Sequence, residues 1–308
     1  MNLNFLERKE EVEREIKMIK PLDAHLHLRR GEMLKLVLPY SACQFGEAII
    51  MPNTNPPILN AKDAEKYRKE IISALPDGSD FKPFMTIQIT PHTTPRIIED
   101  AKHVGVIAGK LYPRGVTTNS QDGFSVEDFR SDRARSIFGK MESQRIVLSI
   151  HGEISGDLLY REKNFIGLGF LEWLADNFPD LKVVMEHLST SEAVGRIIAL
   201  PDNFGATITP HHMILTCDDV LELEGKEKEP DFIPENLVST AEEAAEAMGI
   251  GSKYEGVYGV KFPHNYCKPV ANLPHDREAL LQAAVSGSPK FFLGTDSAPH
   301  PKSDKESD

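Results

Sequence analysis

Two histidines and an arginine alternate near the start of the chain, in the segment His25-Leu26-His27-Leu28-Arg29. In a β-strand, residues two apart point to the same side, so His25, His27 and Arg29 would share one face. Imidazoles are common metal ligands, and a guanidinium binds carboxylates through a fixed fork of donors. The spacing therefore indicates a metal site beside an anion-binding group. A half-exposed structural strand with a polar face would explain this segment alone equally well.

Further residues of the ligand type follow short apolar runs that predict β-strands. They are Asn53 after 48–51, Lys110 within 106–112, His151 after 146–150, His187 after 182–185, and Asp296 after 291–294. A single histidine at a strand end is usually structural. Ligand-type residues delivered by six strands are hard to explain by packing, and we expect them to meet at one rim.

Strand-like and helical segments alternate along most of the chain. Strands are predicted at 22–28, 48–51, 84–90, 106–112, 146–150, 182–185, 205–209 and 291–294. Helices are predicted at 5–19, 33–43, 61–74, 95–103, 126–143, 167–177 and 191–199. About eight such repeats favour a parallel (β/α)8 TIM-type barrel, whose catalytic residues lie at the carboxyl ends of the strands. A doubly wound open sheet is the alternative, but no glycine-rich nucleotide-binding motif follows a strand.

The predicted organisation is one domain over residues 1–308, with a charged surface insertion at about 221–261. The insertion contains a predicted helix at 240–248 and no residues to which we assign chemistry. The sequence stops soon after the eighth predicted strand. We therefore expect a barrel without a full eighth helix.

Composition excludes several functional classes. The formal net charge is −12 and no basic patch occurs, which argues against nucleic-acid binding. No apolar run is long enough for a signal peptide or a membrane span. The cysteines Cys43, Cys217 and Cys267 form no C-x-x-C pair, so neither a disulfide framework nor a thiolate zinc site is indicated. A reducing cytoplasm is the expected compartment.

Four histidines and a carboxylate are more ligands than one catalytic zinc ion takes. They suit two metal ions that share a negatively charged bridge. Lys110 is unusual in this set, because an ammonium group among cations would lose its proton readily. The neutral amine can react with carbon dioxide to give a carbamate, which is a bridging carboxylate. Alternatively, Lys110 turns away to an ion pair at the surface.

Several motifs occur in an order that resembles the single-function (class II type) dihydroorotases of the amidohydrolase superfamily. They are His-x-His-x-Arg, Met-Pro-Asn, Lys-Leu-Tyr-Pro with Thr-Thr-Asn-Ser, His-Gly-Glu, Glu-His and Gly-Thr-Asp-Ser-Ala-Pro-His, spread over residues 21–300. His-x-His and the late aspartate alone would indicate only the superfamily. The longer motifs narrow the resemblance to this family. The family continues into a substrate-contacting loop, a closing helix and a tail, which this sequence lacks.

The resemblance implies a site with two Zn²⁺ ions per chain, bridged by a carboxylated lysine and a hydroxide. One ion would be held by His25, His27, Asp296 and carboxylated Lys110, and the other by Lys110, His151 and His187. The resemblance gives no such role to other histidines, so His92, His211 and His212 are interpreted as loop residues. Cys267 is interpreted as a packing residue.

The resemblance also implies the substrate contacts. The α-carboxylate of the substrate would be bound by Arg29, Asn53 and His300. Thr117 and Thr118 would belong to a mobile lid that closes over the substrate. Backbone groups at Asn265 would meet the pyrimidine ring.

The implied reaction is the reversible cyclisation of N-carbamoyl-L-aspartate to L-dihydroorotate in de novo pyrimidine (UMP) biosynthesis. Asp296 would be the catalytic residue, carrying a proton between the hydroxide and the leaving ring nitrogen. The expected partner is this small-molecule substrate, and a homodimer is left open. Two alternatives stand beside this interpretation. One is a catalytically weak or silent assembly subunit. The other is a related cyclic amidase of the hydantoinase or allantoinase type, which the predicted carboxylate clamp disfavours.

Overall fold

The structure is a computed structural model that describes residues 18–223 and 258–306. Two sequence predictions, the helices at 5–19 and 240–248, therefore lie wholly or almost wholly outside the described residues. Within the described ranges, no helix is both long enough and apolar enough to cross a membrane.

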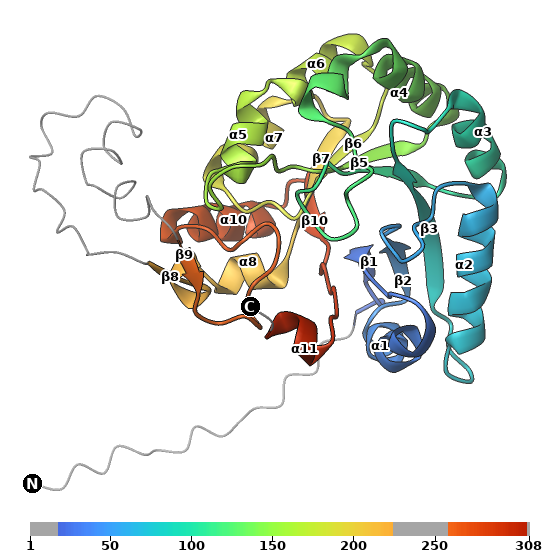
Figure 1. Cartoon of the computed structure of the whole chain (residues 1–308), viewed down its shortest axis with the longest axis horizontal. Helices are drawn as coiled ribbons and strands as arrows, with labels where there is room; N and C mark the ends of the chain where they lie inside the picture. The colour runs from blue at the N-terminus through green and yellow to red at the C-terminus, as the bar shows by residue number, and fades with distance from the viewer. Residues whose placement is uncertain (1–17, 224–257, 307–308) are drawn as a thin grey trace, which may run out of the picture.

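Eight parallel strands form the centre of the molecule, and helices surround them (Figure 1). The strands follow one another in chain order around the sheet. They are β1 Leu22–Leu26, β2 Glu47–Ile50, β3 Lys82–Ile89, β4 Ala108–Leu111, β5 Val147–His151, β6 Val183–Glu186, β7 Phe204–Ile208 and β10 Phe291–Leu293. All eight strands predicted from apolar runs are present, with shifted ends. This confirms the (β/α)8 barrel and excludes the open sheet.

The first and last strands meet through the residues that follow β10. Asp296 N donates to His25 O at 2.9 Å, and His27 N donates to Ser297 O at 3.1 Å. The carboxylate of Asp23 in β1 accepts from Thr295 N at 2.8 Å and from Thr295 Oγ1 at 2.6 Å. These bonds bring Asp296 against His25 of β1 and against His27, which lies just after this strand.

Ten α-helices lie in the described part of the chain. They are α1 Gly31–Gln44, α2 Ala61–Ala74, α3 Pro95–His103, α4 Asp132–Gln144, α5 Arg161–Gly167, α6 Phe170–Asn177, α7 Ser191–Ala199, α8 Pro210–Ile214, α10 Pro274–Val285 and α11 Lys302–Lys305. The bounds of α2, α3 and α7 are those predicted, and each helix begins after a capping side chain, Asn60, Thr94 or Thr190. The helix predicted at 126–143 is wrong as one element. It is a 3-10 turn (Val126–Arg130) followed by α4, because Ser131 caps a new helix.

Four of the described helices were not predicted from the sequence: α5, α8, α10 and the short α11. The region 221–261 was predicted as an insertion. Its described ends pair as a small antiparallel ribbon, β8 Leu221–Leu223 and β9 Tyr258–Val260. After β10, the described chain contains only the short helix α11.

Alternating side chains separate the packed shell from the barrel interior. In β5, Leu148 and Ile150 belong to the apolar core between strands and helices, whereas Ser149 and His151 bond to polar partners. The side chains around Gly109, next to Lys110, leave no room for a larger residue. A Cβ at this position would lie only 2.6 Å from Ile89 Cδ1. Glycine at this position therefore lets the shell pack against β4 next to Lys110.

Candidate active site

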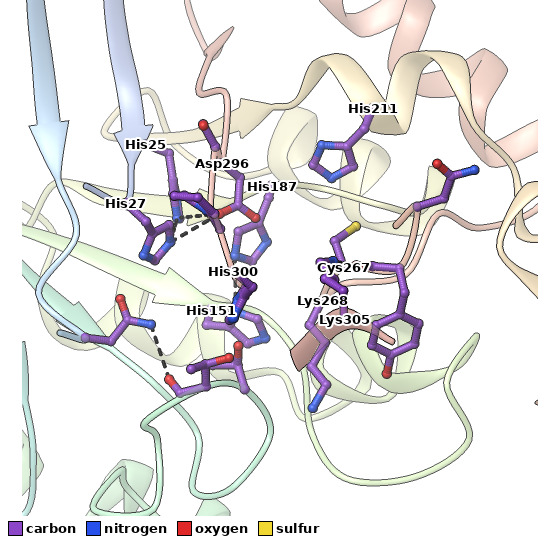
Figure 2. A pocket seen from close by; sticks show the side chains of 18 of the residues that line it. His25, His27, His151, His187, His211, Cys267, Lys268, Asp296, His300 and Lys305 are labelled. Atoms are coloured by element: carbon purple, nitrogen blue, oxygen red, sulfur yellow. Dashed lines mark hydrogen bonds and ion pairs between the residues drawn. The ribbon is translucent and has the colours of Figure 1, made fainter. Parts of the chain in front are cut away.

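The carboxyl ends of the strands surround a cavity of about 650 Å³ (Figure 2). Its walls include most of the residues that the sequence analysis singled out: His25, His27, Arg29, Asn53, Thr117, Thr118, His151, His187, Asn265, Asp296 and His300. The structure thus brings together residues that are up to about 270 positions apart in the chain, as with Arg29 and His300.

His25, His27 and Asp296 form one group of converging side chains. His27 Nε2 lies 3.1 Å from Asp296 Oδ1, and His25 Nε2 lies 3.4 Å from the same oxygen. The two Nε2 atoms are 3.1 Å apart. His25 is in β1, but the strand ends at Leu26, so the prediction of one strand carrying all three polar residues is wrong. His27 nevertheless faces the same side as His25, as Figure 2 shows.

His151 and His187 form the second group, on the neighbouring strand ends. His151 Nδ1 lies 3.1 Å from His187 Nε2. The ring of His187 also lies close to His25, with ring centroids 5.1 Å apart. One ligand atom each from His25, His187 and Asp296 falls within 4.8 Å of the others. The two groups are therefore adjacent, as a two-metal centre requires.

Carboxylates behind the histidines fix which ring nitrogen faces the cavity. Glu186 Oε2 lies 2.8 Å from His25 Nδ1, and Glu153 Oε2 lies 2.7 Å from His151 Nε2. A carboxylate accepts, so these nitrogens carry the protons and the opposite nitrogens present lone pairs to the cavity. The sequence analysis quoted both glutamates within motifs but gave them no role. The signal available was a carboxylate next to a ligand histidine, in Glu186-His187 and His151-Gly152-Glu153.

Lys110 points into the barrel interior and is fully buried. Its Nζ has no hydrogen-bond partner among the described residues, and neither has His187 Nδ1. Burial lowers the pKa of Lys110 to about 8, although the charges of Glu186 and Asp296 oppose this. The alternative of a surface ion pair is therefore excluded. Buried polar atoms without partners among the described residues, set among histidines and a carboxylate, form a donor set that suits metal binding.

Burial also keeps the candidate ligands in the protonation states that metal binding needs. It lowers the pKa of His27 to about 4 and lowers the pKa values of His151 and His187 below the usual histidine value. Burial opposes ionisation of Asp296, but the charge of His25 and the hydrogen bond from His27 outweigh it and lower the pKa of this carboxyl group. At neutral pH, His27, His151 and His187 are therefore neutral imidazoles and Asp296 is a carboxylate.

Arg29 and His300 lie side by side in the wall of the cavity. Arg29 Nη2 donates to His300 Nε2 at 2.9 Å, and Arg29 Nε donates to Pro299 O at 2.9 Å. Arg29 has a φ of +57°, and its carbonyl accepts from Tyr67 Oη at 2.5 Å. Because His300 Nε2 accepts, its Nδ1 carries a proton that can be donated to a ligand.

Asn53 connects this wall of the cavity to the predicted lid. Its Nδ2 donates to Thr118 O at 3.2 Å, and Asn119 Nδ2 donates back to Asn53 O at 3.0 Å. Asn53 Oδ1 is buried without a partner among the described residues. Thr117 and Thr118 therefore lie over the cavity in this structure, held to the loop that carries Asn53.

The opposite wall differs from the sequence-based interpretation. His211 and His212 are on α8 and are not loop residues, and His211 lines the cavity. Asn265 also lines it, but its side chain donates to Asp219 O and its backbone N–H donates to Phe262 O. A backbone contact from Asn265 to a ligand would therefore have to come from its carbonyl group.

Cys267 lies on the same wall, beside His211 in Figure 2. Burial raises the pKa of its thiol, which agrees with the prediction of a packing residue and not a nucleophile. Lys268 and Lys305, which the sequence analysis did not single out, also line this wall. They add positive charge to the wall that carries His211 and Cys267.

Comparison with known proteins gives a consistent result. No protein-family profile matches the chain. A dihydroorotase of Acaryochloris marina is 42% identical over 94% of this chain and 73% of its own length. The crystal structure of dihydroorotase from Campylobacter jejuni is 37% identical, with a TM-score of 0.73 over 92% of this chain and 71% of that one.

A Saccharomyces cerevisiae dihydroorotase, solved in complex with 5-fluoroorotic acid, is 32% identical with a TM-score of 0.72, over 93% of this chain and 71% of that one. These dihydroorotases share 32–42% sequence identity with this chain over most of both lengths, and the two solved structures have the same barrel fold. Most of the residues to which the sequence resemblance assigns metal or substrate contacts line the cavity. The chain belongs to the dihydroorotase family of the amidohydrolase superfamily.

Proposed function

We propose that this cavity interconverts N-carbamoyl-L-aspartate and L-dihydroorotate, as a cyclic amide hydrolase of pyrimidine biosynthesis. The observation that carries the proposal is the adjacency of two histidine pairs, Asp296 and a buried lysine to an arginine–histidine anion clamp. The known dihydroorotases support the substrate class, and the 5-fluoroorotic acid complex of the yeast protein is consistent with a carboxylated pyrimidine ligand.

The residues present fit two divalent metal ions, which we propose to be zinc. His25, His27 and Asp296 would hold one ion, His151 and His187 the other, and carboxylated Lys110 both. Bound zinc would supply an acidified water and Lewis acidity toward a carbonyl group. Lys110 suits carboxylation, because its buried amine has a pKa of about 8 and reaches the neutral state easily.

Arg29 and His300 would bind the substrate carboxylate. The Arg29 guanidinium is held in place by Pro299 O and His300, so its orientation is fixed before substrate arrives. His300 Nδ1 and Asn53 Nδ2 add neutral donors on either side. A hydantoin or allantoin has no carboxylate for this clamp, which favours dihydroorotate over those substrates.

Asp296 would hold and move the proton. Its Oδ1 lies against His25 and His27, which leaves Oδ2 to receive a proton from water and return it to the ring nitrogen. The lowered pKa of Asp296 keeps this carboxylate ionised, and therefore able to accept, at neutral pH. The loop of Thr117 and Thr118 would exclude bulk water while the proton is carried.

We further propose that the enzyme works in a reducing cytoplasm, as one barrel domain with a surface insertion at about 221–261. The three cysteines support the compartment, since no two of them form a disulfide. The convergence of every proposed ligand on one cavity argues against a silent assembly subunit, because such a subunit has no need to retain the whole set.

The test is to measure metal content and dihydroorotate hydrolysis on the same sample of the full chain. We expect close to two zinc ions per chain together with turnover. Two ions without turnover would refute the proposed reaction and favour the silent subunit. Turnover of hydantoin or allantoin but not of dihydroorotate would favour the related cyclic amidase.

A further inference from the structure

Two buried carboxylates outside the cavity hold the segment that follows His187. Glu162 of α5 accepts from Ser189 N through both of its oxygens at 3.1 Å, from Ser189 Oγ at 3.1 Å, and from Thr190 Oγ1. Asp276 of α10 accepts from Ser191 N at 2.8 Å and from Ser191 Oγ at 2.9 Å. Both carboxylates are almost completely buried.

The segment begins at a residue in an unfavourable backbone conformation. His187 has a φ of +43°, in the left-handed region that residues other than glycine rarely adopt. Its backbone N–H donates to Thr207 Oγ1 at 2.6 Å, and Leu188 N donates to Thr207 O at 3.0 Å. Such a conformation persists only where the surroundings over-determine it. Bonds from β7 therefore fix its start, and bonds from α5 and α10 fix residues 189–191.

Capping of α7 does not account for Glu162. Thr190 already caps this helix, because its side chain accepts from Ala193 N. Burying a carboxylate away from water is unfavourable, and within the described part of the chain the hydrogen bonds to Glu162 all come from two adjacent residues just beyond His187. These bonds to residues 189 and 190 restrain the neighbouring His187. Its Nε2 lies 3.1 Å from His151 Nδ1, and this position depends on the backbone that follows.

We propose that Glu162 and Asp276 are positioning residues for the metal centre, which hold residues 189–191 so that His187 keeps its ring in the cavity. This inference rests on the proposed function, because it assigns His187 to a metal ion. Without the two carboxylates, His187 could relax to a negative φ and turn its ring away from His151. The ion held by the His151–His187 pair would then be lost first, while the ion held by His25, His27 and Asp296 would be retained.

The experiment uses the full zinc-loaded chain and the variants Glu162→Gln and Asp276→Asn. Both keep the size of the side chain and replace one carboxyl oxygen, which accepts hydrogen bonds, by an amide nitrogen, which donates them. Release of zinc to a colorimetric chelator is followed over time, and thermal unfolding is recorded on the same samples. We expect one of the two ions to be bound roughly tenfold more weakly, as is typical when a group supporting a ligand is removed. The other ion should be released as in the parent chain.

Ser131→Ala is the matched control. It removes the side-chain cap of α4, which accepts from Ala134 N, and so lowers stability without touching the segment after His187. Ser189→Ala is a milder variant for the case in which Glu162→Gln does not fold. It removes one hydroxyl donor and keeps the backbone N–H bonds, so we expect a smaller shift in the same direction.

The outcomes separate this inference from the proposed function. If the variants lose stability like Ser131→Ala but release both ions as the parent does, the carboxylates are structural and the inference is wrong. If the parent holds two zinc ions without turning over dihydroorotate, the proposed reaction fails, while the comparison of zinc release still decides the inference. A parent chain that binds no zinc would overturn both.

Discussion

Replacement of Arg29 by lysine tests whether the proposed anion clamp depends on the geometry of the guanidinium group as well as on its positive charge. Arg29 donates Nε to Pro299 O and Nη2 to His300 Nε2, so its remaining donors point in a fixed direction. Lysine keeps the positive charge but loses both anchors and the planar fork. One charge-assisted hydrogen bond contributes about 2 kcal/mol, so losing one should raise KM for dihydroorotate roughly 30-fold.

The assay is the initial rate of dihydroorotate hydrolysis over a range of substrate concentrations. The carboxylate does not react, so its contact should be similar in the ground state and the transition state, and kcat should change much less than KM. Arg30→Lys is the control in the neighbouring residue. Arg30 pairs with Glu70, with Nε and Nη2 at 3.0 and 2.7 Å from the same oxygen, and it does not line the cavity.

A specific result would refute this reasoning. If Arg29→Lys lowered kcat and left KM unchanged, Arg29 would act on the reacting atoms and not on the carboxylate. If Arg30→Lys raised KM as much as Arg29→Lys, the effect would come from the loop after β1 and not from the guanidinium in the cavity.

Three further changes test other parts of the site. Asp296→Asn should lower kcat at least roughly 100-fold with an unchanged circular dichroism spectrum, and retained turnover would remove Asp296 as the proton carrier. Lys110→Ala should lower zinc content measured by atomic emission, and an unchanged content would contradict the bridge. Burial and the charge of His211 lower the pKa of His212 from 6.5 to about 3, so stability present above pH 6.5 is lost as the pH falls toward 3. In urea unfolding, the parent should lose about 2 kcal/mol more than His212→Gln between pH 7 and pH 5, and equal losses would contradict this.

The strand order and the rim of ligands could be predicted from the sequence because both depend on local patterns. Each barrel strand is a short apolar run, and each proposed ligand follows one of these runs or lies within it. Capping residues fixed the starts of α2, α3 and α7. The short helices α5 and α8 were missed, since five to seven residues are too few for a helical period to be recognised.

The parts of the site that were missed depend on contacts between distant strands. Glu186 bonds to His25 across 161 residues, and no local pattern indicates which histidine a buried glutamate will support. The left-handed backbone of Arg29 likewise follows from tertiary bonds to Tyr67 and Pro299. The sequence therefore predicted which residues meet, but not which nitrogen each histidine presents.

Closure of the barrel between β1 and the end of β10 has a consequence for how the protein is made. The bonds between Asp23 and Thr295 join residues 272 positions apart. During synthesis, His25 and His27 leave the ribosome long before Asp296 exists, so this group of three side chains stays incomplete until residue 296 has been made. Folding of such non-local contacts is slow, because the entropy of closing a long loop is lost before the contacts form. If this group holds a metal ion as proposed, the ion would bind only after Asp296 has been made, and a chain that ends before this residue would present its histidines without the carboxylate.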